Sequence, residues 1–144
     1  LFTEMWVPLH RAPEVMRALR DFWAAGGLEA TGTFATEIYP APASPFTLSA
    51  ASGGPRLRID PFVFWREDAK PELDYFKGYW ELLKQHDARF HWGKSLSEPG
   101  SSTGAAYRRA ECGATAWDAW KALRDVRDPD RIFVSHYWRA HLAL

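Results

Sequence analysis

The chain of 144 residues is long enough for one compact domain with a hydrophobic core and too short for two. Its 18 basic and 18 acidic side chains give a formal net charge of zero, which argues against a nucleic-acid-binding domain because such domains carry a basic excess. It contains no apolar run of the roughly 18 residues that a membrane span needs. The single cysteine, Cys112, cannot form an internal disulfide and is typical of a reducing compartment, so a cytoplasmic location is expected.

The first residues predict that the chain is part of a longer protein. Leu1 is not an initiator methionine, and an apolar run begins there without a polar leader. Natural N-termini usually start with a few disordered polar residues. We therefore interpret residues 1–144 as a single domain cut from its neighbours.

The first half of the chain contains two clearly alternating segments. Residues 2–9 and 33–39 alternate along the chain with the period of two that is typical of strands. In the second segment, Glu37 and Tyr39 point to the same side of the strand. Both segments are therefore predicted to belong to a sheet.

A third strand is predicted over residues 57–65. Within it, Asp60-Pro61 indicates a sheet edge or a bulge, because proline cannot donate to the hydrogen-bond ladder. Residues 40–55, between the second and third strands, form a loop rich in proline, serine, alanine and glycine. Such a long loop is usually functional or mobile, and the apolar Phe46 and Leu48 suggest that it packs onto another part of the protein.

Three helices are predicted from their apolar periodicity. The first begins near Pro13, whose missing N–H costs nothing in a first turn, and ends at Gly26-Gly27. The second begins at Pro71, and the third runs from an N-cap at Thr115 to a stop at Asp128. Their apolar stripes are Val15, Met16, Leu19, Phe22 and Trp23; Leu73, Phe76, Tyr79, Trp80 and Leu83; and Trp117, Trp120, Leu123 and Val126.

The order of these elements predicts the fold class. A short extended piece at residues 90–94 and a loop at residues 95–104 separate the second and third helices. Strand, helix, two strands and then helices indicate an α+β domain, in which helices flank an antiparallel sheet.

Several kinds of site are excluded by the motifs. The paired glycines lack phosphate-loop spacing, so no nucleotide-binding signature is present. Cys112 has no evident activating partner. His136 and His141 are five residues apart, which is the wrong spacing for two ligands on one helix face, so no metal site is expected.

Two features suggest chemistry. Glu37 lies on an apolar strand face, where desolvation would raise its pKa and suit it for proton transfer, although an exposed strand glutamate fits the pattern as well. In His91-Trp92-Gly93-Lys94, Gly93 allows close backbone approach and Lys94 offers a cation beside a developing anion. The alternative for Lys94 is a turn residue after an amphipathic helix.

Together these segments resemble the C-terminal domain of the FAD-linked lactone and alditol oxidases, a family within the vanillyl-alcohol-oxidase superfamily. The likeness covers essentially the whole chain in the family's order. Its most specific parts are the His91-Trp92-Gly93-Lys94 element and the Asp128-Pro129-Asp130 ending.

This resemblance implies a fold, a reaction and a set of residues. The domain would be the cap over a flavin. The flavin itself would be held mainly by an N-terminal FAD-binding domain that this chain lacks. The reaction would oxidise a hydroxyl of a sugar-derived lactone, polyol or related alcohol by hydride transfer. Glu37 and Lys94 would be catalytic, with Lys94 also beside the flavin. The expected substrate contacts are Tyr39, Phe64, His91 and Trp92.

The chain departs from the family's pattern at two places. Tyr39 stands where the family has arginine, and the third strand is more apolar than in the alditol oxidases. A plain alditol is therefore not the expected substrate. The competing hypothesis is a free-standing, non-catalytic α+β ligand-binding or interaction domain, which predicts no bare apolar patch.

Overall fold

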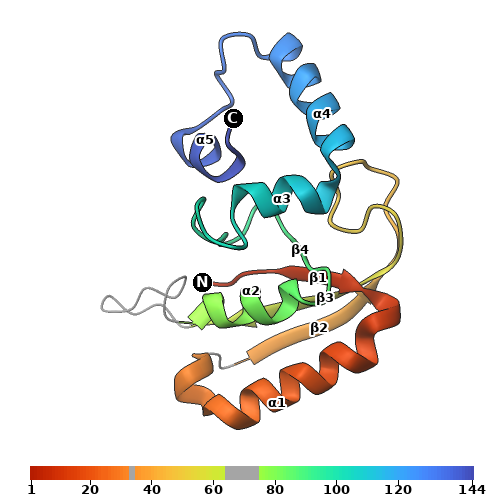
Figure 1. Ribbon diagram of the computed structural model, residues 1–144, viewed down its shortest axis with the longest axis vertical. Coiled ribbons are helices and arrows are strands. Elements are labelled where there is room, and N and C mark those ends of the chain that lie inside the picture. The colour runs from red at the N-terminus through yellow and green to blue at the C-terminus, as the bar shows by residue number, and fades with distance from the viewer. Residues whose placement is uncertain (33–34, 64–74) are drawn as a thin grey trace.

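The fold is built on a four-stranded antiparallel sheet with strand order β2-β3-β1-β4 (Figure 1). The computed structural model describes residues 1–32, 35–63 and 75–144. Its strands are β1 (Met5–Pro8), β2 (Ala35–Ala41), β3 (Arg56–Phe62) and β4 (Arg89–Phe90). The predicted α+β class, with an antiparallel sheet flanked by helices, is confirmed.

Helices make up most of the rest of the described chain. They are α1 (Ala12–Thr31), α2 (Lys77–Lys84), α3 (Ala105–Cys112), α4 (Ala114–Arg127) and α5 (His136–Leu142), with a 3₁₀ turn at Leu9–Arg11. Among the described residues, none of these helices is both long enough and apolar enough to cross a membrane.

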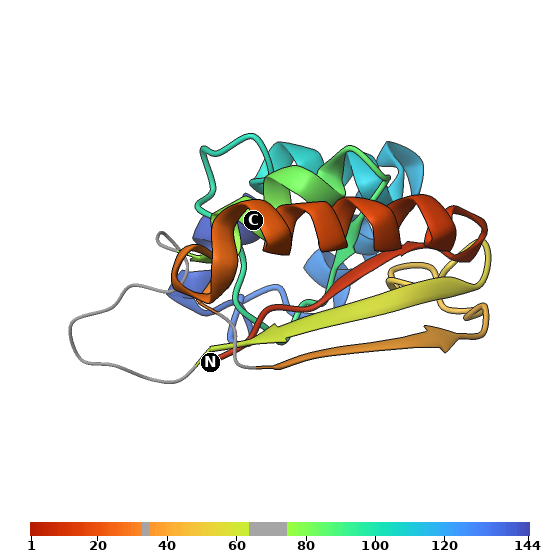
Figure 2. The same ribbon diagram turned by 90° about the horizontal axis from the view of Figure 1, so that it is seen from below.

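One face of the sheet packs against α1 and α2, which lie side by side on it (Figure 2). Met5 and Val7 of β1 and Ile59 of β3 are fully buried, since alternate residues of a strand point to the same side. Burying such a side chain contributes about 1.5–3 kcal/mol each. The predicted alternation is therefore present in β1, and the structure shows that the side of Met5 and Val7 is its core face.

The first helix follows its prediction except at Met16 and at its C-terminal end. Val15 and Leu19 are fully buried, whereas Met16, predicted to lie in the buried stripe, is exposed. The backbone leaves helical geometry at Gly27, where φ is 64°, and helical turns then resume as far as Thr31. The predicted glycine break is present, but it kinks the helix instead of ending it.

The second helix buries its stripe as predicted. Phe76, Tyr79, Trp80 and Leu83 are all buried in the core. Trp80 Nε1 also donates to Thr3 Oγ1 at 2.9 Å, which ties α2 to the chain before β1. The predicted helix start at Pro71 and the apolar Leu73 lie outside the described residues.

Of the two alternatives predicted at Asp60-Pro61, a sheet edge or a bulge, the sheet edge is wrong. β3 lies inside the sheet, between β2 and β1. Its pairing with β1 runs only from Arg56 to Ile59, and Pro61 lies beyond that stretch, opposite Thr36 of β2. Beyond Pro61, Phe2 and Phe62 form an isolated antiparallel bridge, so the chain before β1 still runs beside β3. Pro61 therefore lies in a gap of this pairing, where no ladder hydrogen bond from its nitrogen is needed.

The C-terminal part differs most from prediction. The sequence predicted neither α3 nor α5. The predicted N-cap at Thr115 is wrong, because α4 begins at Ala114 after Gly113, whose φ of 84° ends α3 and starts the new helix. The predicted stop at Asp128 is confirmed, since α4 ends at Arg127.

Candidate functional site

The sheet face turned away from α1 and α2 carries a row of polar and aromatic side chains, which we call the open face. Alternation places these side chains opposite the buried ones on every strand. Cross-strand pairs join Glu37 to Asp60 and Tyr39 to Arg58. The open face consists of Phe2, Glu4, Trp6, Glu37, Tyr39, Arg58, Asp60 and His91.

Two buried carboxylates share one guanidinium at the centre of the open face. Glu4 is 2% exposed and Asp60 is 0% exposed. Arg58 Nη2 lies 3.0 Å from Glu4 Oε2 and 2.5 Å from Asp60 Oδ2. Trp6 Nε1 donates to the other oxygen of Glu4 at 2.6 Å. Buried charges need such partners, so Arg58 holds this cluster together.

The protonation of this cluster follows from its burial. Burial raises the pKa of Asp60, and the charges of Glu4 and Glu37 raise it further. The hydrogen bond and the charge of Arg58 lower it but do not cancel the shift. Burial also lowers the pKa of Arg58, but its bond to Asp60 and the charges of Asp60 and Glu4 outweigh that effect and raise it. Arg58 is therefore a permanent cation between two acids.

Tyr39 lies directly against this cation. The Arg58 Cζ atom is 4.7 Å from the centre of the Tyr39 ring and 5.8 Å from the centre of the Trp6 ring. A guanidinium at these distances is attracted to the faces of aromatic rings. At the position where the resembled family has an arginine, this chain therefore places a tyrosine that contacts an arginine of the next strand.

The His91-Trp92-Gly93-Lys94 element forms a turn after β4. Lys94 N donates to His91 O at 3.2 Å, and Gly93 N donates to His91 Nδ1 at 3.0 Å. The Nδ1 atom therefore accepts, which leaves the proton of a neutral ring on Nε2, 4.0 Å from Glu4 Oε1. Burial lowers the pKa of His91, although Glu4 opposes the shift.

Lys94 joins the open face through Phe2. Its Nζ atom lies 4.1 Å from the centre of the Phe2 ring, and that ring stacks on Phe62 at 4.8 Å. The turn is fixed beside the start of the chain, because Ser95 N donates to Phe2 O and Thr3 Oγ1 donates to Ser95 O. The ammonium group is thus held at one end of the open face.

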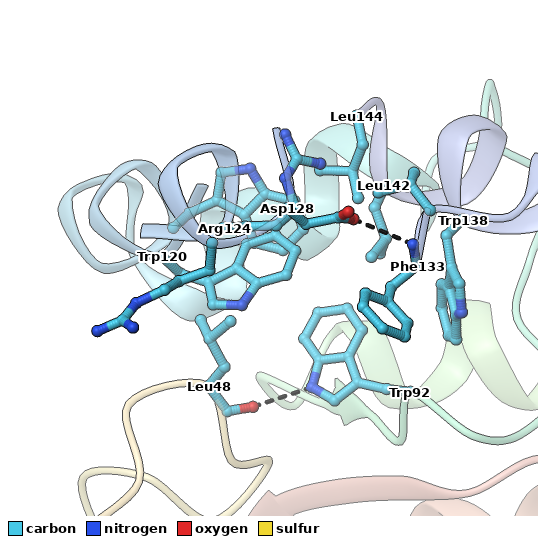
Figure 3. A pocket seen from close by; sticks show the side chains of 12 residues that line it. Leu48, Trp92, Trp120, Arg124, Asp128, Phe133, Trp138, Leu142 and Leu144 are labelled. Carbon is cyan, nitrogen blue, oxygen red and sulfur yellow. Dashed lines mark hydrogen bonds between the residues drawn. The ribbon is translucent and has the colours of Figure 1, made fainter. Parts of the chain in front are cut away.

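Trp92 points away from the other predicted site residues into a second, apolar site. Its Nε1 donates to Leu48 O at 2.9 Å, and its ring lies 6.0 Å from that of Trp117 (Figure 3). The prediction that the 40–55 loop packs onto another part of the protein therefore holds at Leu48, whereas Phe46 is 76% exposed.

This second site is a cavity of about 530 Å³ between the 40–55 loop, α4 and α5. Tryptophans and leucines form most of its wall. Asp128 closes one side, where its carboxylate accepts from the backbone of Ile132 and Phe133 at 2.8 and 3.0 Å (Figure 3). The Asp128-Pro129-Asp130 ending therefore has a structural role, which is to fold the turn after α4.

The structure places four of the predicted site residues on one face of the sheet. Glu37 and Tyr39 lie on β2, His91 and Lys94 follow β4 at the opposite edge, Trp92 lines the cavity, and Phe64 lies outside the described residues. Glu37 is exposed in this chain, so of the two alternatives the exposed strand glutamate is confirmed and desolvation by the strand face is wrong for the domain by itself.

Sequence reasoning missed the buried cluster of Glu4, Arg58 and Asp60. The sequence did contain a signal for this cluster. Charged and apolar residues alternate along the third strand, as Arg56, Leu57, Arg58, Ile59 and Asp60. That pattern gives a polar face to a strand with an apolar core face. Only the pairing of β1 with β3 brings Glu4 to the same place.

The remaining candidate nucleophile is inert. Burial raises the pKa of the Cys112 thiol to about 12, and the negative charge of Glu111 acts in the same direction. A reactive cysteine needs a lowered pKa. The structure therefore agrees with the absence of an activating partner in the sequence.

Comparison with known proteins identifies the family of the chain. The family model D-arabinono-1,4-lactone oxidase matches residues 2–141. L-gulono-1,4-lactone dehydrogenase of Mycobacterium tuberculosis, in strains CDC 1551 / Oshkosh and ATCC 25618 / H37Rv, is 32% identical over 65 residues. That match covers 45% of this chain and only 14% of the relative. The family match extends over nearly all of the chain, so the protein belongs to the D-arabinono-1,4-lactone oxidase family of oxidoreductases.

Proposed function

We propose that the open face is the substrate-facing wall of an FAD-dependent oxidoreductase. The reaction removes a hydride from a CH–OH group of a sugar-derived lactone, polyol or related alcohol. The observation that supports this most strongly is that Glu37, Tyr39, His91 and Lys94 share one sheet face. These residues come from two separate regions of the sequence, and all of them carry groups that bind or polarise a hydroxyl.

In this proposal Glu37 holds the substrate hydroxyl. Its carboxylate accepts the hydroxyl hydrogen, which orients the carbon that loses the hydride and favours departure of the proton. Glu37 is exposed on β2, and the rest of the protein would cover it together with the substrate. Closure of that kind removes water and strengthens the contact.

In this proposal Lys94 lies beside the flavin. FAD, when bound, supplies the hydride acceptor, and its reduced ring carries negative charge. The Lys94 ammonium is held on the open face by its contact with Phe2 and by the turn that precedes it. A fixed cation in a dry site stabilises such a charge far better than one in water.

The other part of the flavin site belongs, in this proposal, to an N-terminal FAD-binding domain. The matched segment is 14% of the relative's length, which supports a longer parent protein. Val126, Ile132 and Phe133 are 77%, 76% and 84% exposed. Bare apolar side chains of this size mark surfaces that a partner covers. They argue against the competing hypothesis of a free-standing domain.

Substitution of the two proposed catalytic residues tests the function. In the full-length flavin-loaded protein, Glu37→Gln and Lys94→Met should each slow flavin reduction by substrate about 100-fold. The measurement is anaerobic bleaching of the oxidised flavin absorption with a panel of lactones and polyols. Wild-type protein that no candidate bleaches would argue against the activity.

Matched controls separate this effect from a general loss of charge. Glu98 and Lys77 are exposed residues outside the open face. Glu98→Gln and Lys77→Met should leave the reduction rate unchanged. Unchanged rates in the Glu37 and Lys94 variants as well would remove both residues from the site.

A further inference from the structure

We propose that Arg58 is a positioning residue for the reaction, which fixes the ring of Tyr39 and with it the hydroxyl that Tyr39 offers to the substrate. The inference rests on the proposed function and adds to it a residue outside the motifs that suggested the site. Arg58 and Tyr39 face each other across β3 and β2, with the guanidinium 4.7 Å from the ring centre.

Arg58 is itself immobilised, which a positioning residue must be. Its Nη2 atom contacts both Glu4 and Asp60, and these carboxylates are almost completely buried. Glu4 is held in turn by the Trp6 indole N–H. Rotation of Arg58 out of this arrangement would leave two buried carboxylates without their shared cation, which is strongly unfavourable.

Tyr39 needs a partner that fixes the orientation of its ring, because its own surroundings restrict the ring little. It is 37% exposed and lies on the outermost strand, β2, next to Pro40. A half-exposed phenol on an edge strand has few neighbours to select one orientation of its ring. The cation beneath the ring provides one, since a guanidinium and an aromatic face attract each other by about 0.5–2 kcal/mol.

The consequence is a Tyr39 hydroxyl with a defined position beside Glu37. The two residues are two positions apart on β2 and point to the same side. A substrate hydroxyl bound by Glu37 would therefore meet a second, preorganised polar group along the same strand. Displacement of such a group weakens binding and orientation of the substrate.

Arg58→Lys is the informative substitution, because lysine keeps a cation near Glu4 and Asp60 but lacks the planar group that lies on the ring. The experiment measures anaerobic flavin reduction in the full-length flavin-loaded protein, with a lactone or polyol that bleaches the wild type. We expect the substrate concentration for half-maximal reduction rate to rise about tenfold. The limiting rate of flavin reduction should change by much less than tenfold. The melting temperature should change little.

A double-mutant cycle connects the effect to Tyr39. Tyr39→Phe should raise the half-maximal concentration to a similar extent, and Arg58→Lys should add little on top of it, because both substitutions disturb the same contact. Arg20→Lys, in an exposed pair with Asp21, is the control that should change nothing.

The outcomes separate this inference from the proposed function. A wild-type flavin that no lactone or polyol bleaches would overturn both. Bleaching of the wild type, combined with additive effects of Arg58→Lys and Tyr39→Phe, would overturn the inference alone. Should Arg58→Lys lower the melting temperature, Tyr39→Phe still decides, because an unchanged half-maximal concentration in that variant removes the tyrosine hydroxyl from the substrate site.

Discussion

At the scale of single residues, the carboxyl group of Glu111 in α3 is strongly affected by its surroundings. Phe90 N donates to its Oε1 atom at 3.3 Å, whereas Oε2 is enclosed without a hydrogen-bond partner among the described residues. Part of the side chain reaches solvent, but its carboxyl end does not. Burial raises the pKa of Glu111 to about 8, although the hydrogen bond from Phe90 and the charge of Arg108 oppose the shift.

This shift predicts a pH-dependent stability. An unfolded glutamate loses its proton near pH 4.3, so between about pH 4.3 and pH 8 the folded chain holds a proton that the unfolded chain has lost. Raising the pH through this window therefore lowers the free energy of unfolding. Glu111→Gln should flatten the dependence, as measured by denaturant unfolding of the chain from about pH 5 to pH 9. Glu98→Gln, in an exposed loop, should keep the wild-type slope; equal slopes in wild type and Glu111→Gln would contradict the argument.

At the scale of elements, the junction of α3 and α4 depends on one backbone conformation. Gly113 has a φ of 84° and a ψ of 127°, and it is the last cap of α3 and the first of α4. Only glycine adopts such angles readily. A Cβ atom there would meet nothing within 4 Å, so any cost of a side chain comes from the backbone alone.

Gly113→Ala should therefore lower the free energy of unfolding by about 1–2 kcal/mol. Gly54 is the matched control, because a Cβ atom there also meets nothing within 4 Å, and its φ is not in the left-handed region. Gly54→Ala should be neutral or slightly stabilising, since alanine restricts the unfolded chain. Denaturant unfolding of both variants provides the measurement, and equal stabilities would show that the junction tolerates a side chain.

At the scale of the whole molecule, the exposed apolar side chains set how the chain behaves in solution. Four of them lie on α4 and the turn that follows it: Leu123, Val126, Ile132 and Phe133. Such a surface is costly in water and favours association.

The chain by itself should therefore self-associate, and the double substitution Val126→Ser, Phe133→Ser should reduce that association without lowering the melting temperature. Sedimentation velocity over a range of protein concentrations measures the effect. Met16→Ser removes an exposed apolar side chain on α1 and should leave association unchanged. A wild-type chain that stays monomeric at all concentrations would show that this surface needs no partner.

The sequence predicted helices and strands correctly where a single apolar periodicity runs through the whole element. β1 and α2 show clear periodicities, and their buried residues, such as Val7 and Leu83, were assigned correctly. α3 and α5 were not predicted because they are short, and because their polar and aromatic residues form no simple apolar stripe at helical spacing. Arg108 illustrates this, because it is fully buried in α3, where its side chain donates to Ser97 O and Thr103 O. The sequence pattern did not predict a buried arginine, since its burial depends on how the loop before α3 folds to aim its carbonyl groups at the guanidinium.

The same division holds for the site. Sequence by itself determined the family, the α+β class, and the grouping of Glu37 with Tyr39 on one strand face, because each depends on local order along the chain. Only the tertiary structure decided that Glu4, Arg58 and Asp60 form one buried cluster beside them, and that Trp92 faces a separate cavity. Strand register brings residues more than 50 positions apart to within hydrogen-bond distance, and burial then sets their charges. Neither pairing nor burial is encoded at any single position of the sequence.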